Sequence, residues 1–102
     1  MENLSQEEWR ALIEKTDNAV ILDVRTPQEW EEGCVADAEK LNFLEPASFM
    51  EGLEELDKSK TYFIYCRSGN RSGQAGMLME QNGFNETYNL LGGMLEWDGD
   101  LV

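Results

Sequence analysis

The chemistry that this sequence offers most clearly lies in seven residues, Cys66 to Ser72, which read CRSGNRS. The cysteine follows the apolar run Thr61–Tyr65, and a helical pattern begins near Ser72. Backbone N–H groups of a glycine-containing loop and the N-terminus of a helix both favour negative charge on a sulfur between them. In such surroundings the pKa of a cysteine falls from about 8.5 to roughly 3.5–7.5. We therefore interpret Cys66 as a nucleophile.

The charge pattern singles out the same loop. The chain has 21 acidic and 8 basic residues and a formal net charge of −13, yet residues 61–79 contain no acid and carry Arg67 and Arg71. A strand, a tight loop and a packed helix leave little room for charges, which is the plain alternative explanation. Guanidinium and backbone N–H donors together bind small anions well. The pattern favours a small anionic substrate at this loop.

The chain contains no histidine, so a Cys–His pair cannot activate the nucleophile and the activation must be electrostatic. A thiolate that attacks sulfur needs no proton transfer, and loop dipoles can stabilise the charge. Four residues separate Cys66 from Arg71, one fewer than in the corresponding loop of cysteine phosphatases. The tighter loop suits a persulfide better than a phosphate. Phosphatase or arsenate reductase activity is therefore the less favoured alternative.

Strand and helix patterns alternate along the chain, which predicts an α/β fold with a central, mostly parallel sheet and helices on both faces. The expected strands are residues 19–22, 40–43, 61–65 and 86–90. The expected helices are residues 6–15 after a cap at Ser5, 27–32 after a cap at Thr26, 47–56, 72–82, and a short one carrying Met94 and Trp97. Ligands of such sheets bind at the carboxyl ends of strands, and the Cys66 loop leaves from one.

Length and composition predict one domain over residues 1–102. The strong negative charge argues against binding to nucleic acid or to an anionic membrane, and it favours a monomer. We expect a cytoplasmic protein, because no signal-peptide pattern or membrane-length apolar stretch is present. Cys34 and Cys66 have no CxxC neighbour, so we expect reduced thiols, no metal site and no cofactor.

Three motifs in this order resemble the single-domain rhodaneses, a family of sulfurtransferases. They are ILDVRTPQEWEEG at residues 21–33, YCRSGNRS at 65–72 and GFNETYNLLGGMLEW at 83–97. The resemblance implies an α/β fold in which Cys66 takes sulfane sulfur from thiosulfate or another persulfide donor. The Cys66 persulfide then passes its outer sulfur to cyanide, a thiol or a partner protein. The implied substrate-binding residues are Arg67, Ser68, Gly69, Asn70, Arg71 and Ser72, with both arginines on the anionic donor.

One segment departs from the family pattern. The usual GHIPGAxNIP is GCVADAEKLNF at residues 33–43, where Cys34 replaces histidine, Asp37 replaces glycine and the proline is missing. The local backbone path and a partner surface therefore remain open. We expect Cys34 to be a small buried filler, and Asp23 and Arg25 to be structural. A second functional hypothesis is a sulfur-relay or regulatory binding module without independent turnover.

Overall fold

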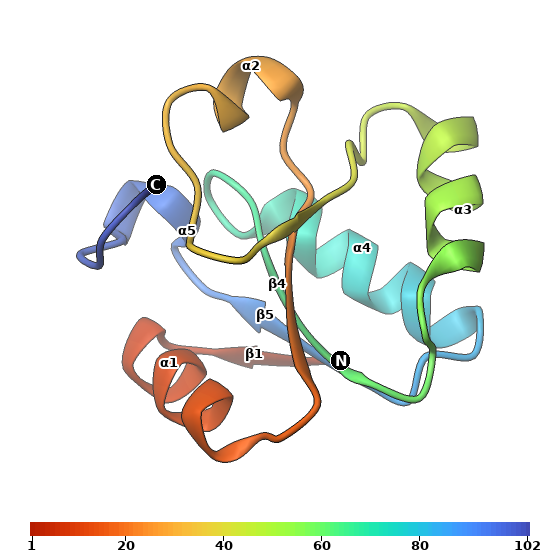
Figure 1. Cartoon of the computed structure of the whole chain (residues 1–102), viewed down its shortest axis with the longest axis horizontal. Helices are drawn as coiled ribbons and strands as arrows, with labels where there is room; N and C mark the ends of the chain where they lie inside the picture. The colour runs from red at the N-terminus through yellow and green to blue at the C-terminus, as the bar shows by residue number, and fades with distance from the viewer.

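The centre of the molecule is a five-stranded sheet, shown in a computed structural model that describes residues 1–102 (Figure 1). Its strand order is β1-β5-β4-β2-β3, and every pair of neighbours is parallel. The strands are β1 (Glu2–Leu4), β2 (Ala19–Asp23), β3 (Glu39–Lys40), β4 (Thr61–Tyr65) and β5 (Glu86–Leu90). The predicted α/β class with a parallel sheet is confirmed.

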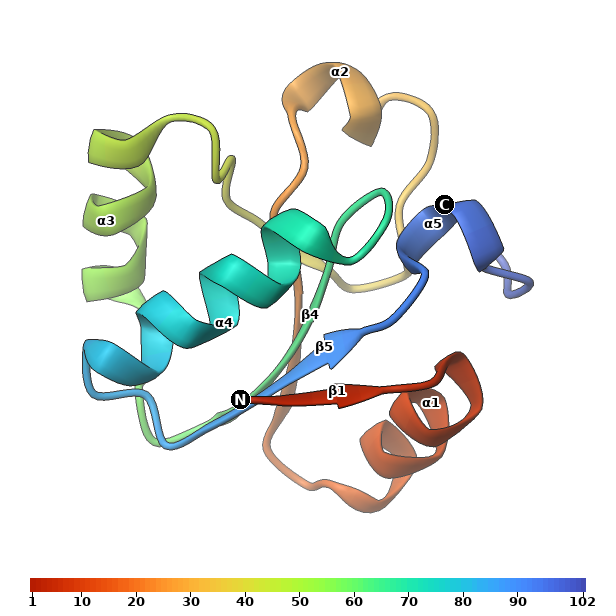
Figure 2. The ribbon, with the colours of Figure 1, turned by 180° about the vertical axis from the view of Figure 1, so that it is seen from behind.

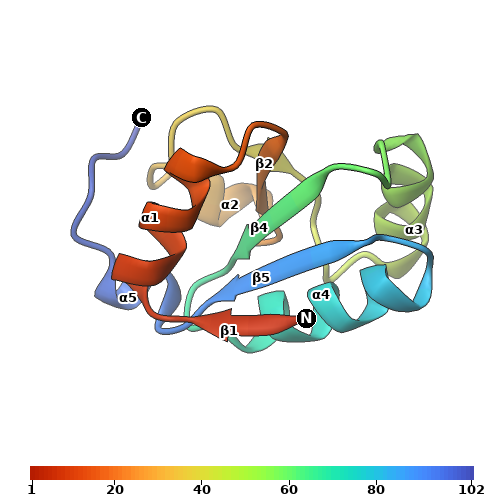
Figure 3. The ribbon, with the colours of Figure 1, turned by 90° about the horizontal axis from the view of Figure 1, so that it is seen from below.

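Helices cover both faces of this sheet, as predicted. They are α1 (Gln6–Lys15), α2 (Pro27–Trp30), α3 (Pro46–Glu55), α4 (Asn70–Gln81) and α5 (Gly93–Glu96). Figure 3 shows α1 above the strands and α4 below them, and Figure 2 shows α3 beside α4. None of these helices has the length and apolar character needed to cross a membrane.

Strand β4 divides the apolar core into two clusters because its side chains alternate between the faces. All five of its residues are buried, as expected of a central parallel strand. Tyr62 and Ile64 belong to the cluster that contains residues of α3 and α4, whereas Phe63 and Tyr65 join Trp9 of α1 in the other. The Trp9 ring meets Phe63 and Tyr65 edge to face, with centroids 6.0 and 6.2 Å apart. Such pairs add about 0.5–1.5 kcal/mol each beyond area burial.

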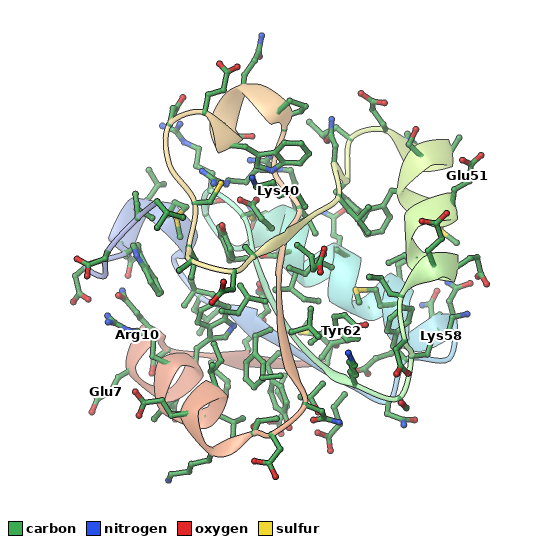
Figure 4. The ribbon with its side chains drawn as sticks, viewed as in Figure 1. Glu7, Arg10, Lys40, Glu51, Lys58 and Tyr62 are labelled. Atoms are coloured by element: carbon green, nitrogen blue, oxygen red, sulfur yellow. The ribbon has the colours of Figure 1, made fainter.

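The charged residues lie mainly outside these clusters. Figure 4 shows Glu7 and Arg10 on the outer side of α1 and Glu51 on α3, whereas Tyr62 lies within the molecule. The two predicted capping boxes are present, with Ser5 paired to Glu8 and a second box before α2. Each box satisfies two backbone N–H groups that the helix itself leaves unpaired. The starts of α1 and α2 are therefore decided locally.

Besides shifts of one residue in β2 and α3, four elements differ from the sequence prediction. Strand β1 was not predicted, since an edge strand of three residues is too short to show alternation. Strand β3 covers residues 39–40 instead of 40–43. Helix α2 ends at Trp30 rather than Glu32. The N–H groups of Glu32 and Gly33 bond to carbonyls three residues back, as in a 3₁₀ turn, instead of four. Helix α4 begins at Asn70 rather than Ser72, because Gly69 forms its N-cap in the left-handed region with a φ of 101°.

Candidate active site

Cys66 directly follows β4 at the carboxyl edge of the sheet, and none of its surface is exposed. The loop from Cys66 to Gly69 lies between α2 and α5, as Figures 1 and 2 show from opposite sides. It leads into α4, so the predicted strand–loop–helix arrangement is present. The sulfur therefore has no direct contact with solvent in this structure.

Three hydrogen-bond donors converge on the sulfur of Cys66. The N–H of Gly69 lies 3.1 Å from Sγ, the N–H of Ser72 3.4 Å, and the hydroxyl oxygen of Ser72 3.3 Å. Burial by itself raises the pKa of the Cys66 thiol, but these hydrogen bonds and the N–H of Ser68 outweigh burial and lower the pKa. The Ser72 N–H belongs to the first turn of α4, so the helix N-terminus adds positive potential. The site thus favours a thiolate.

Helix α5 holds the loop from its other side. The N–H of Met94 donates to the carbonyl of Cys66 and the N–H of Leu95 to that of Arg67, both at 3.0 Å. These contacts turn the loop's carbonyls away from the sulfur and towards α5. Gly93, at a φ of 52°, permits the close approach, since a Cβ there would lie only 2.5 Å from the Cys66 carbonyl oxygen. Gly92, the N-cap of α5, and Gly93, its first residue, serve this turn.

Asn89 of β5 connects the loop to the sheet. Its amide nitrogen donates to the Gly69 carbonyl at 3.0 Å and to the Asn3 side chain at 2.9 Å, and both of its N–H groups are thereby used. Its oxygen faces the Ser72 hydroxyl, which also lies against Cys66. The serine has one proton for two acceptors, so the amide and the sulfur compete for it. Asn89 therefore fixes both the loop and the serine that touches the Cys66 sulfur.

The two arginines of the loop have different surroundings. Arg71, in the first turn of α4, forms a bidentate ion pair with Glu29 of α2, at 2.8 and 2.9 Å. Arg67 is exposed and takes no part in any ion pair of the protein. The sequence prediction assigned both guanidinium groups to the donor. In this structure only that of Arg67 is free of a protein carboxylate.

A buried polar network lies behind the site. Asp23, at the end of β2, accepts hydrogen bonds from the Arg25 guanidinium and from the Tyr65 hydroxyl, each with a shortest distance of 2.7 Å. Arg25 also donates to the Gly33 carbonyl, and the Tyr65 oxygen accepts from the Val35 N–H. Burial and the Asp23 carboxylate raise the pKa of Tyr65. This network ties β2 and β4 to residues 33–35.

The segment that departs from the family pattern, residues 33–43, consists of turns and irregular backbone around the two-residue strand β3. Asp37 adopts a φ of 66°, the left-handed conformation that the family's glycine also permits. Cys34 is buried, and its sulfur lies 3.4 Å from the Trp30 carbonyl and 3.7 Å from Arg25. This buried position agrees better with the predicted role of Cys34 as a small core residue than with a second reactive site. No group of three or more His, Cys, Asp or Glu side chains is arranged to hold a metal ion.

The structure thus brings some predicted residues to the sulfur and leaves others away from it. Gly69 and Ser72 contact Sγ, whereas the side chains of Ser68 and Asn70 make no hydrogen bond and are exposed. Sequence reasoning missed Asn89, Glu29 and the N–H groups of α5. The only signal for Glu29 was the general expectation that a partly buried arginine has a carboxylate partner.

Comparison with known proteins agrees with this geometry. Residues 5–100 match the Rhodanese-like domain family. The chain is 36% identical over 97 residues to a sulfurtransferase of Allochromatium vinosum, covering 94% of this chain and 82% of the relative. It is 36% identical over 91 residues to the thiosulfate sulfurtransferase GlpE of Coxiella burnetii, covering 89% and 80%.

Solved structures show the same likeness. The rhodanese-like domain protein of Staphylococcus aureus superposes with a TM-score of 0.85 at 27% identity, over 100% of this chain and 97% of that one. Together with the fold and the Cys66 loop, these matches place the chain in the rhodanese-like domain family, as its sequence motifs indicated. Relatives with about a third of their residues identical are named sulfurtransferases, which supports a transferase of this family.

Proposed function

We propose that the protein transfers sulfane sulfur from thiosulfate or another persulfide donor to a thiophilic acceptor through a persulfide on Cys66. The Cys66 thiolate attacks the outer sulfur of the donor, and the sulfur–sulfur bond of the donor breaks. With thiosulfate, sulfite leaves with the bonding electron pair. The acceptor, which is a thiol, cyanide or a partner protein, then attacks the outer sulfur, and the Cys66 thiolate leaves.

The observation that carries this proposal is the set of three donors around Sγ, from Gly69 and Ser72. They stabilise the thiolate before attack and remain in place for the persulfide anion, which carries the same charge. Arg67 offers an unpaired guanidinium at the loop for an anionic donor. Neither step needs a general base, which agrees with the absence of histidine.

The direct test is mass spectrometry of the purified protein after treatment with thiosulfate and removal of the excess. The peptide that contains Cys66 should gain about 32 Da, the mass of one sulfur atom, and lose it on addition of cyanide. A Cys66→Ser variant supplies the control. If the Cys66 peptide gains no mass with thiosulfate or with a low-molecular-weight persulfide, the proposal is wrong.

The complete burial of Cys66 favours a second candidate, a relay module that discharges slowly until a partner opens the site. Such a protein would load sulfur at Cys66 but turn over slowly with cyanide or small thiols. Steady-state turnover with these acceptors separates the two. Turnover at about 1 s⁻¹ or faster, within the ordinary range for enzymes, would exclude the relay role.

We also propose that the protein works as a cytoplasmic monomer. Both cysteines are free, which suits a reducing compartment, and the net charge of −13 opposes self-association at low salt. Size-exclusion chromatography with light scattering tests the first point, and a mass of twice 11.7 kDa would contradict it. Cell fractionation tests the second.

A further inference from the structure

Arg71, which sequence reasoning placed on the donor, is already occupied by a carboxylate of the protein. Its two terminal nitrogens each meet one oxygen of Glu29, a residue 42 positions earlier in the chain. The ion pair is mostly shielded from solvent, with about a fifth of each side chain exposed, 21% for Arg71 and 17% for Glu29. A bidentate pair of this kind is net neutral and geometrically specific.

We propose that Glu29 is a specificity-determining residue, which cancels the charge of Arg71 and so favours sulfur donors with one negative charge over donors with two. The inference rests on the proposed sulfur transfer at Cys66. With Arg71 neutralised, the positive groups left for the donor are Arg67 and the loop N–H dipoles. A dianion that approaches the Cys66 thiolate therefore meets less compensation than two arginines would give.

Glu29 is held in place independently of Arg71. Its Oε1 also accepts the N–H and the hydroxyl of Thr26, both at 3.1 Å, in the capping box of α2. Hydrogen bonds from Arg71 lower the pKa of Glu29 to about 2, so the carboxylate stays ionised throughout the working range of a thiolate enzyme. The neutralising charge is therefore a permanent part of the site.

Arg71 is also electrostatically coupled to the nucleophile. Hydrogen bonding to Glu29, and to a smaller extent the nearby charge of Cys66, raise the pKa of the Arg71 guanidinium. A change in the net charge of the Arg71–Glu29 pair is therefore felt where the donor must bind.

Two donors of similar shape isolate this charge effect. Thiosulfate is a dianion, and its reaction with the thiolate yields the Cys66 persulfide anion and the sulfite dianion. Methanethiosulfonate is a monoanion, and the same attack yields the persulfide anion and methanesulfinate. In both reactions the S–S bond of the donor breaks and the leaving group takes the electron pair. The ratio of their kcat/KM values measures the preference of the site for the second charge.

The test compares this ratio in the native protein and in Glu29→Gln. We expect the ratio of the kcat/KM for thiosulfate to that for methanethiosulfonate to rise by about 3- to 10-fold. Glutamine keeps an oxygen that can cap α2, but it no longer compensates the positive charge of Arg71. The rise should shrink as salt is added. Glu32→Gln is the matched control, because it makes the same charge change at an exposed position just after α2. An equal rise in both variants, or none in Glu29→Gln, would overturn the proposal.

Removing the arginine gives the opposite sign. Arg71→Gln leaves the Glu29 carboxylate uncompensated, so the ratio should fall below the native value. The double variant Glu29→Gln with Arg71→Gln replaces a neutral ion pair by a neutral hydrogen-bonded pair and should return the ratio to within about twofold of native. If the ratio in the double variant equals that of either single variant, Glu29 does not act by neutralising the charge of Arg71. Thermal unfolding checks that each variant is folded.

Alkylation of Cys66 tests the electrostatic claim without any sulfur transfer. The rate with iodoacetate, an anion, divided by the rate with neutral iodoacetamide should rise about 2- to 5-fold in Glu29→Gln, followed on the Cys66 peptide. If no donor loads Cys66, the proposed function is wrong, and this ratio alone then decides the role of Glu29. An unchanged alkylation ratio would show that Glu29 only supports α2.

Discussion

Both cysteines are buried and each has an arginine nearby, but the two sulfurs differ in the backbone groups with which they form hydrogen bonds. The sulfur of Cys66 accepts from the N–H of Gly69, the N–H of Ser72 and the Ser72 hydroxyl. The thiol of Cys34 instead donates to the carbonyl of Trp30. Hydrogen-bond donors stabilise a thiolate, and those around Cys66 lower the pKa of its thiol. Backbone N–H groups thus face the sulfur of Cys66, whereas a backbone carbonyl faces that of Cys34.

The neighbouring arginines support the same distinction. Arg25 lies 3.7 Å from the Cys34 sulfur, but its guanidinium is committed to Asp23 in a pair that is almost completely buried. Arg71 beside the active loop is likewise committed, to Glu29. Neither arginine is a free counter-charge for a sulfur. Proximity of an arginine is thus a poor guide to thiol reactivity in this chain.

Replacing each cysteine in turn gives the largest expected contrast. Cys66→Ala should lower sulfur-transfer turnover by about a thousandfold or more, because the proposed nucleophile is lost. Cys34→Ala should change turnover by less than about threefold and cost roughly 1 kcal/mol of stability, the usual scale for a modest core truncation. Turnover with thiosulfate and cyanide, measured beside urea unfolding, compares the two. A larger loss of turnover in Cys34→Ala would make Cys34 a second reactive thiol.

The Asp23–Arg25 pair should have the next largest effect, on stability. Asp23→Asn leaves the Arg25 charge buried without its carboxylate, which costs about 3–5 kcal/mol in the free energy of unfolding. Asp98→Asn is the control, because it breaks the exposed pair with Arg10 and should cost less than about 1 kcal/mol. Chemical denaturation measures both. Similar losses in the two variants would mean that the buried network is not a scaffold.

Ser72 tests the donor set around the active sulfur. Because the lowered pKa of Cys66 depends on its donors, Ser72→Ala should raise that pKa towards its ordinary value. The rate of Cys66 alkylation follows the thiolate fraction, so its pH profile should shift to higher pH in the variant. Ser68→Ala removes an exposed hydroxyl without hydrogen bonds and serves as control. Identical pH profiles for the two variants would refute the role of the Ser72 hydroxyl.

The smallest effect is expected in the segment around Cys34. Asp37 has a positive φ, so Asp37→Gly should raise stability by up to about 1 kcal/mol, and Asp37→Val should lower it by about 1–2 kcal/mol. Thermal unfolding measures the two shifts, and turnover should stay unchanged in both. A loss of stability in the glycine variant would show that the Asp37 side chain matters more than its backbone conformation.

Sequence patterns were most informative where one segment carries its own signal. The bounds of β4 and β5 agree with the prediction to the residue, and β4 carries the clearer signal, because a strand buried on both faces is rich in β-branched and aromatic residues. The sequence pattern starts α4 at Ser72, two residues late, because Gly69 and Asn70 read as part of the loop. Gly69 takes the left-handed conformation before α4, and the N–H groups of Gly69 and Ser72 both reach the Cys66 sulfur.

The sequence alone thus determined the α/β class, the position of Cys66 at a strand end and the family. These follow from local spacing, which chain neighbours set among themselves. Only the tertiary structure decided that Arg71 pairs with Glu29, that Asn89 anchors the loop, and that α5 binds its carbonyls. The partners come from segments that the strand order brings together, and hydrophobic periodicity carries no record of which polar groups then meet.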